Sequence, residues 1–165
     1  MPLIQRIPNN FSTSFSNAVV VTMGEYSTIY ISGQVGYVVG GPVKVTSESF
    51  EEEAMLCYFN IDKSLQEVGA TLKDIVRITA YLTDAKDYPV YDKVRQETFA
   101  GAPPSSSTVI VAGLLANARL EVDAIAVIKK RRPRFTRAGF PLGSLEDIDS
   151  SPSPRAGKNQ PGSAG

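Results

Sequence analysis

Two carboxylates, Glu121 and Asp123, stand two positions apart in a segment where apolar and polar residues alternate. If this segment is a β-strand, both side chains project from the same face. Two ionised carboxylates at that spacing repel, which raises the pKa of one of them toward the range useful for acid–base catalysis. The alternative is a solvated strand face on which Arg119 neutralises Glu121. We favour a catalytic role for Glu121 and a solvated position for Asp123.

A short motif, Ser32-Gly33-Gln34, follows a β-branched run and offers a second chemical feature. A glycine at a strand end lets backbone N–H groups approach a substrate anion closely. The structural alternative is that Gly33 permits a β-bulge or tight packing. Tyr37 follows the motif closely and could present its phenol to the same cleft. The hydroxyl-rich residues 105–108 are either a surface for an oxygen-rich ligand or the polar start of a strand.

The chain contains no histidine and a single cysteine, Cys57. This composition excludes Ser-His-Asp and Cys-His nucleophile systems and imidazole metal ligands, and it argues against a zinc site. Any proton transfer must use carboxylates, tyrosines, lysines, hydroxyls or water. A single cysteine excludes an internal disulfide and fits a reducing compartment. We therefore expect no metal and no cofactor, and we expect Cys57 to be a core residue.

The net charge of zero conceals an asymmetry along the chain. Residues 1–128 carry nine Lys and Arg against fourteen Asp and Glu, whereas residues 129–165 carry eight against three. The basic cluster at 129–137 is a weak signal for RNA or an acidic partner, because the acidic remainder is a poor platform for nucleic acid. No apolar run approaches the roughly 20 residues of a membrane span, and the N-terminus lacks the layout of a secretory signal. We expect a cytoplasmic protein that binds neither membranes nor nucleic acid.

The elements of the first half can be predicted from residue periodicity. β-Branched runs predict strands at residues 17–23, 27–32 and, more briefly, 43–45. Ser49 and Glu52 have the spacing of a capping box, and the apolar residues that follow recur every three or four positions. This pattern predicts a helix that ends at Gly69.

The second half alternates strand and helix. Residues 75–82 form a β-branched run, and a helix capped by Asp87 follows and ends before Gly101. Two further strands are predicted at 107–112 and 120–129. The order of elements predicts an α+β layer in which two helices pack on one face of a mixed sheet.

The composition changes near residue 130. We predict a folded domain over residues 1–130, followed by a tail over residues 131–165 that is basic and then rich in Ser, Pro and Gly. Residues 138–165 contain too little apolar surface to offset the entropy of ordering them, so we expect them to be mostly disordered.

Several dispersed motifs stand in the order and spacing of a known family. They are Ile31-Ser32-Gly33-Gln34-Val35-Gly36, Asn60, Gly69, Tyr81-Leu82-Thr83-Asp84, the segment 103–114 and the segment 120–127. In these features, over about residues 15–128, the chain resembles the RidA/YjgF/UK114 family of small trimeric proteins. The resemblance implies a RidA-like (chorismate-mutase-like) fold, a homotrimer with clefts between subunits, and cofactor-free hydrolysis of reactive enamines and imines.

The resemblance also implies roles for individual residues. In the family, the cleft that holds the small-molecule ligand is lined by the Ser-Gly-Gln turn, by an arginine segment and by a glutamate of the last strand. Ser32, Gly33 and Gln34 match the first of these elements. Glu121 matches the glutamate, which positions the attacking water or moves a proton.

Three positions depart from the family pattern. Ser106 stands where the family keeps an arginine that holds the substrate carboxylate, Thr108 where a cysteine is common, and Phe15 where we place the cleft tyrosine. A guanidinium offers two charge-assisted hydrogen bonds and a serine one neutral donor, a difference on the order of 1.5–3 kcal/mol or tenfold to a hundredfold in affinity. Amino-acid-derived enamines should therefore be poor substrates. Arg95 and Arg119 could substitute, but neither matches the family position, and we interpret both as surface charges.

Three functional hypotheses follow. The first is cofactor-free acid–base catalysis on a small imine, enamine or enol-type metabolite, with Glu121 acting directly or through water, in metabolite repair or a biosynthetic pathway. The second is a trimer whose clefts bind a small metabolite without turnover. The third is an RNA- or protein-interacting factor that uses the basic tail. We favour the first.

Overall fold

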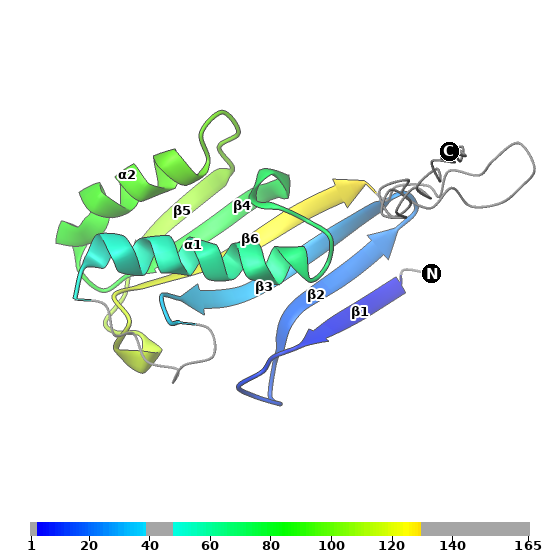
Figure 1. Cartoon of the computed structure of the whole chain (residues 1–165), viewed down its shortest axis with the longest axis horizontal. Coiled ribbons are helices and arrows are strands. Elements are labelled where there is room, and N and C mark those ends of the chain that lie inside the picture. Colours follow the sequence, from blue (N-terminus) through cyan, green and yellow to red (C-terminus); the bar gives the residue numbers. More distant parts are fainter. Residues whose placement is uncertain (1–2, 39–47, 130–165) are drawn as a thin grey trace, which may run out of the picture. The chain divides into compact units, whose positions relative to one another are not determined.

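The computed structural model of the chain describes residues 3–38 and 48–129. Six strands form one sheet in the order β1-β2-β3-β6-β4-β5 (Figure 1). They are β1 (Leu3–Pro8), β2 (Ser16–Met23), β3 (Tyr26–Val35), β4 (Ile75–Leu82), β5 (Ser105–Ile110) and β6 (Leu120–Lys129). Neighbouring strands run antiparallel, except that β4 and β5 are parallel. The predicted mixed sheet is confirmed.

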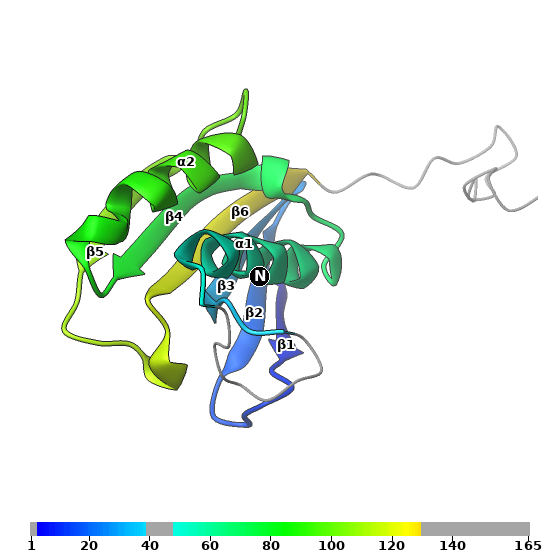
Figure 2. The same cartoon turned by 60° about the vertical axis from the view of Figure 1, so that its left-hand side comes forward.

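Two α-helices, α1 (Phe50–Gln66) and α2 (Tyr88–Thr98), cover the same face of the sheet (Figures 1 and 2). Helix α1 begins where predicted, because the Ser49 hydroxyl accepts a hydrogen bond from the Glu52 backbone N–H and three acidic residues occupy the first turn. Gly69 follows the helix with a φ of +74°, a conformation that favours glycine and turns the chain away. The predicted α+β architecture, with both helices on one face, is confirmed.

The core lies between the helices and the covered face of the sheet. Side chains along β6 alternate, so that every second residue from Leu120 to Ala126 is buried and the residues between them stay partly exposed. The apolar face of α1 that joins the same core consists of Phe50, Ala54, Cys57, Ile61 and Leu65. Cys57 is completely buried, as expected. This packing fixes which face of β6 is turned away from the helices.

The other face of the sheet is open in the described part of the chain (Figure 2). Residues that pair directly across neighbouring strands share a face. By this criterion the open face carries Ile4, Tyr30 and Val109, all of them exposed, together with the Glu121 side chain. The open face is therefore partly apolar and also holds the predicted catalytic group.

Several details of the elements differ from the sequence prediction. Strand β3 runs on to Val35, past the predicted end at Ser32, so the Ser32-Gly33-Gln34 motif lies inside the strand. Strand β1 is not predicted, because it lies at a sheet edge and its largely exposed residues do not alternate clearly. Asp87 stands at the N-cap of α2, as predicted, but its side chain makes no capping hydrogen bond there; a short 3-10 helix at Ala85–Asp87 precedes α2, and the side chain of Asp84 caps that helix. Strand β5 begins at Ser105, earlier than predicted, because its pairing with β4 starts there.

Several predictions concern residues beyond those described. The short strand predicted at 43–45 and the tail predicted at 131–165 both lie outside the described residues. None of the helices in the described ranges is long and apolar enough to cross a bilayer.

Candidate functional site

Glu121 lies on the open face of the sheet near the start of β6. Tyr81 of β4 is its directly paired neighbour, and the Tyr81 hydroxyl donates a 3.1 Å hydrogen bond to Oδ2 of Asp123. Burial raises the pKa of the Glu121 carboxyl above its usual value, and the charge of Asp123 raises it further. Glu121 therefore holds a proton more readily than an exposed glutamate does.

Gly33 packs against the carboxylate of Glu121. The pairing of β3 with β6 shifts between Ile31 and Gln34, where Ser32 and Gly33 together face a single residue of β6 and form a β-bulge. A Cβ atom added to Gly33 would lie 2.8 Å from Cδ of Glu121, closer than real Cβ atoms come. The bulge and tight packing, which we weighed as the structural explanation of Gly33, thus place its backbone beside the candidate catalytic group.

The other two residues of the motif have their contacts elsewhere. The Ser32 hydroxyl donates a 2.7 Å hydrogen bond to the Ser16 carbonyl oxygen. The Gln34 side chain is buried, and its Nε2 donates to Oδ1 of Asn17 and to the Ser32 carbonyl oxygen. Gln34 pairs with the buried Val122, so it belongs to the helix-covered face. Of the three motif residues, Gly33 is the one that the described contacts place beside Glu121.

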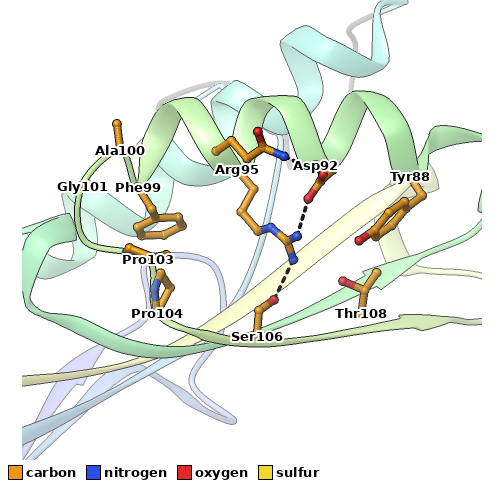
Figure 3. A pocket seen from close by; sticks show the side chains of 11 residues that line it. Tyr88, Asp92, Arg95, Phe99, Ala100, Gly101, Pro103, Pro104, Ser106 and Thr108 are labelled. Atoms are coloured by element: carbon orange, nitrogen blue, oxygen red, sulfur yellow. Dashed lines mark hydrogen bonds and ion pairs between the residues drawn. The ribbon is translucent and has the colours of Figure 1, made fainter.

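A second group of predicted site residues lines a pocket between helix α2 and strand β5 (Figure 3). Its volume of about 860 Å³ is within the range of small-molecule sites. Ser106 and Thr108 form the strand side, and their pairing with buried Ile78 and Ala80 places them on the helix-covered face. The other residues that line the pocket are Tyr88, Asp92, Arg95, Gln96, Phe99, Ala100, Gly101, Pro103 and Pro104.

Arg95 reaches from α2 to the strand and contacts Ser106 directly (Figure 3). Its Nη1 donates a 3.0 Å hydrogen bond to the Ser106 hydroxyl, and its Nη2 pairs with the Asp92 carboxylate. The Arg95 side chain is only 23% exposed, so our interpretation of it as a surface charge is wrong. The available signal was helical spacing, because Asp92, Arg95 and Phe99 recur at steps of three and four.

Arg119 has a different carboxylate partner from the one considered in the sequence. Its Nε lies 2.8 Å from Oε2 of Glu53, a fully buried residue of α1, and its backbone N–H donates to Oε1 of the same side chain at 2.6 Å. The Leu120 N–H donates to Glu53 as well. Glu53 therefore fixes the chain directly before Glu121, a positioning role that sequence reasoning missed.

Neither of the last two predicted residues lines the pocket between α2 and β5. Phe15 is exposed in the segment before β2. Tyr37 lines a separate pocket of about 70 Å³, together with Phe11, Lys63 and Glu67. Burial raises the pKa of the Tyr37 phenol, with a further contribution from the charge of Glu67.

The candidate residues thus divide between two sides of one protomer. Glu121 and Gly33 lie on the open face of the sheet, where they offer a proton-transfer group beside a bulged backbone. Arg95, Ser106 and Thr108 lie in the pocket on the covered face, where they offer a cation and two hydroxyls. Among the described residues there is no cluster of three or more His, Cys, Asp or Glu suited to a metal ion.

Comparison with known proteins gives a consistent result. Residues 8–128 match the model of the family described as endoribonuclease L-PSP. The 2-iminobutanoate/2-iminopropanoate deaminase of Rattus norvegicus is 31% identical over 127 residues, which cover 77% of this chain and 86% of that protein. A protein of the same name from Dermatophagoides farinae is 34% identical over 103 residues, or 62% of this chain and 80% of that protein.

Solved structures agree with the sequence comparison. The crystal structure of RidA from an Antarctic Psychrobacter bacterium is 29% identical, has a TM-score of 0.62, and is covered over 94% of its length by 74% of this chain. The family match and the shared fold lead to one conclusion: the chain belongs to the RidA/YjgF/UK114 family.

Proposed function

We propose that this protein hydrolyses the carbon–nitrogen double bond of small imines, and of the enamines that tautomerise to them, without a cofactor. The relatives named 2-iminobutanoate/2-iminopropanoate deaminase support this reaction class. The observation that carries the proposal is Glu121, a carboxyl group of raised pKa packed against Gly33. A role in metabolite repair or in a biosynthetic pathway fits such an activity.

The chemistry requires one group that can both take and give a proton. Water adds to the imine carbon, the carbon–nitrogen bond then breaks, and the products are a carbonyl compound and ammonia. Glu121 takes a proton from the attacking water and returns it to the leaving nitrogen. Backbone donors near Gly33 and Thr108 stabilise the negative charge that develops on oxygen.

We further propose that the complete site forms between copies of the chain in a homotrimer. Glu121 and the pocket that contains Ser106 lie on opposite sides of the sheet, so a substrate reaches both only where two protomers meet. The exposed apolar side chains of the open face, such as Tyr30 and Val109, support association, because such surfaces mark interfaces. Light scattering on the purified protein tests the oligomeric state: a trimer agrees with the proposal and a stable monomer contradicts it.

The substrate range depends on how the pocket holds a carboxylate. Ser106 provides a short neutral side chain on β5 in place of the family arginine. If the Ser106 hydroxyl were the only group that bound the substrate carboxylate, amino-acid-derived enamines such as 2-aminoacrylate would bind weakly. The strand alone therefore favours neutral imines over those that carry a carboxylate.

Turnover by Glu121→Gln and wild-type protein tests the proposal. An amino-acid oxidase supplies 2-iminobutanoate, an amine oxidase supplies a neutral imine, and the release of carbonyl product is compared with spontaneous hydrolysis. We expect acceleration by the wild-type protein and a loss of about a hundredfold or more in Glu121→Gln, in line with the contribution of a general acid–base group. Equal rates in the two proteins would exclude Glu121 from the reaction.

The same experiment separates the two other hypotheses. A metabolite-binding trimer would bind the carbonyl product yet leave the spontaneous rate unchanged. A factor that acts through its basic tail would require residues 130–165, whereas deletion of that segment leaves imine hydrolysis intact if our proposal is correct.

A further inference from the structure

The pocket between α2 and β5 contains one side chain of each charge. Among the described residues that line it, Arg95 is the only one with a positive charge, and Asp92 is the only one with a negative charge. Figure 3 shows the Arg95 side chain extending from the helix across the pocket toward Ser106, with Asp92 beside it. The cation therefore stands inside the pocket, close to the strand position that the family fills with its own arginine.

Three contacts hold the Arg95 guanidinium in place. Nη1 donates to the Ser106 hydroxyl at 3.0 Å, Nη2 pairs with the Asp92 carboxylate, and the guanidinium carbon lies 5.3 Å from the centre of the Tyr91 ring. Tyr88 also hydrogen-bonds to Arg95, so Ser106, Asp92 and Tyr88 together use three of the five N–H groups of the guanidinium, and donors remain for a ligand. Because the side chain is already fixed, a bound anion does not have to order it.

The short side chain of Ser106 makes this arrangement possible. A longer residue at that position would occupy the space that the Arg95 guanidinium now fills beside the strand. The hydroxyl also accepts the hydrogen bond that orients Nη1. Ser106 therefore both leaves room for the Arg95 guanidinium and orients it through a hydrogen bond.

We propose that Arg95 binds the carboxylate of the substrate in this pocket, with Asp92 and Ser106 as the residues that position its guanidinium. The inference rests on the proposed function, because it names the group that holds an imino-acid substrate. It also reverses the substrate range expected from Ser106 alone, since a planar guanidinium binds a carboxylate through two charge-assisted hydrogen bonds. The ligand class is a small monocarboxylate whose apolar part contacts Phe99, Pro103 and Pro104.

Binding of the carbonyl product tests the inference without any turnover. The dissociation constants of 2-oxobutanoate and of 2-butanone, which lacks the carboxylate, are measured by NMR titration on the full chain. We expect wild-type protein to favour 2-oxobutanoate by about tenfold to a hundredfold, and Arg95→Gln to lose this preference. Lys93→Gln is the matched control, because it removes one positive charge from the same helix at a residue that is 60% exposed and pairs with Glu51.

Two further variants keep the result interpretable. Asp92→Asn combined with Arg95→Gln avoids an unpartnered carboxylate in the pocket, and it should show the same loss of preference if Arg95→Gln alone is unstable. Arg95→Gln combined with Ser106→Arg moves the cation from the helix to the strand and should restore the preference.

The inference would be overturned if wild-type protein bound 2-oxobutanoate and 2-butanone with equal dissociation constants, or if Arg95→Gln kept the wild-type ratio of the two constants. A wild-type protein that binds 2-oxobutanoate through Arg95 but hydrolyses no imine would remove the proposed function and leave the inference intact.

Discussion

Glu53 connects helix α1 to the start of strand β6, and replacing it with glutamine gives the most quantitative test of the site's architecture. The carboxylate is fully buried and accepts from the Arg119 N–H at 2.6 Å, from Arg119 Nε at 2.8 Å and from the Leu120 N–H at 3.2 Å. Glutamine keeps the shape but removes the charge, and its amide N–H₂ replaces one acceptor. In Glu53→Gln, Arg119 therefore loses a buried charge partner.

The structure sets the size of the effect. Removing one member of a buried ion pair costs about 3–5 kcal/mol. The Arg119 side chain is 34% exposed, so water offsets part of this cost. We expect Glu53→Gln to lower the free energy of unfolding by about 2–4 kcal/mol.

Urea denaturation followed by circular dichroism, at one protein concentration, measures this change. Glu51→Gln is the control, since Glu51 lies on the same helix, is 45% exposed and pairs with exposed Lys93, an arrangement worth about 0–1 kcal/mol. If Glu53→Gln and Glu51→Gln unfold at the same urea concentration, Glu53 does not anchor β6, and our account of how Glu121 is positioned is wrong.

Three further predictions concern single residues. Gly33→Ala should displace the flexible Glu121 side chain and reduce imine hydrolysis at least tenfold while the protein stays folded, which circular dichroism and turnover check together; full activity would contradict the close packing. Because burial and Asp123 raise the folded-state pKa of Glu121, its contribution to stability is present at low pH and lost as pH rises through the raised value. Glu121→Gln should therefore have a higher free energy of unfolding than wild type above the raised pKa of Glu121, and a similar one below it, as urea titrations at several pH values would show. A variant that is less stable than wild type at high pH would refute the direction of the pKa shift. Finally, burial raises the pKa of the Cys57 thiol, so a disulfide reagent should modify it only after unfolding, and rapid modification of the native protein would show that the core is open.

Most of the fold could be predicted from the sequence, because the spacing of apolar residues along an element shows which of its side chains are buried. The spacing from Phe50 to Leu65 identified α1, and the alternation from Leu120 to Ala126 identified both β6 and its buried face. Strand β1 was not predicted for the same reason, because the side chains of this edge strand are mostly exposed and show no clear alternation of apolar and polar residues.

The site was less accessible because it depends on long-range contacts. Glu53 and Arg119 are 66 positions apart in the sequence, and no local sequence pattern predicts that their side chains pair. Arg95 and Ser106 are 11 positions apart, but they meet only because α2 packs over the edge strand β5. A family pattern locates Ser106 as a departure, whereas only the fold shows which residue contacts it.

The central claim is that the two halves of the site meet between protomers. It can be tested by mixing two variants, Glu121→Gln, which lacks the proton-transfer group, and Thr108→Trp, which fills the pocket beside β5. Each variant alone should be inactive, since every cleft in its trimer lacks one half. After the subunits are unfolded and refolded together in equal amounts, about a quarter of the clefts in a ring of randomly mixed subunits join two intact halves.

Recovered imine hydrolysis in the refolded mixture is therefore the most direct measurement. The account predicts about a quarter of the activity of wild-type protein at the same total subunit concentration. A mixture that stays inactive, although native mass spectrometry shows oligomers that contain both variants, would mean that each protomer holds its own complete site, which contradicts the account.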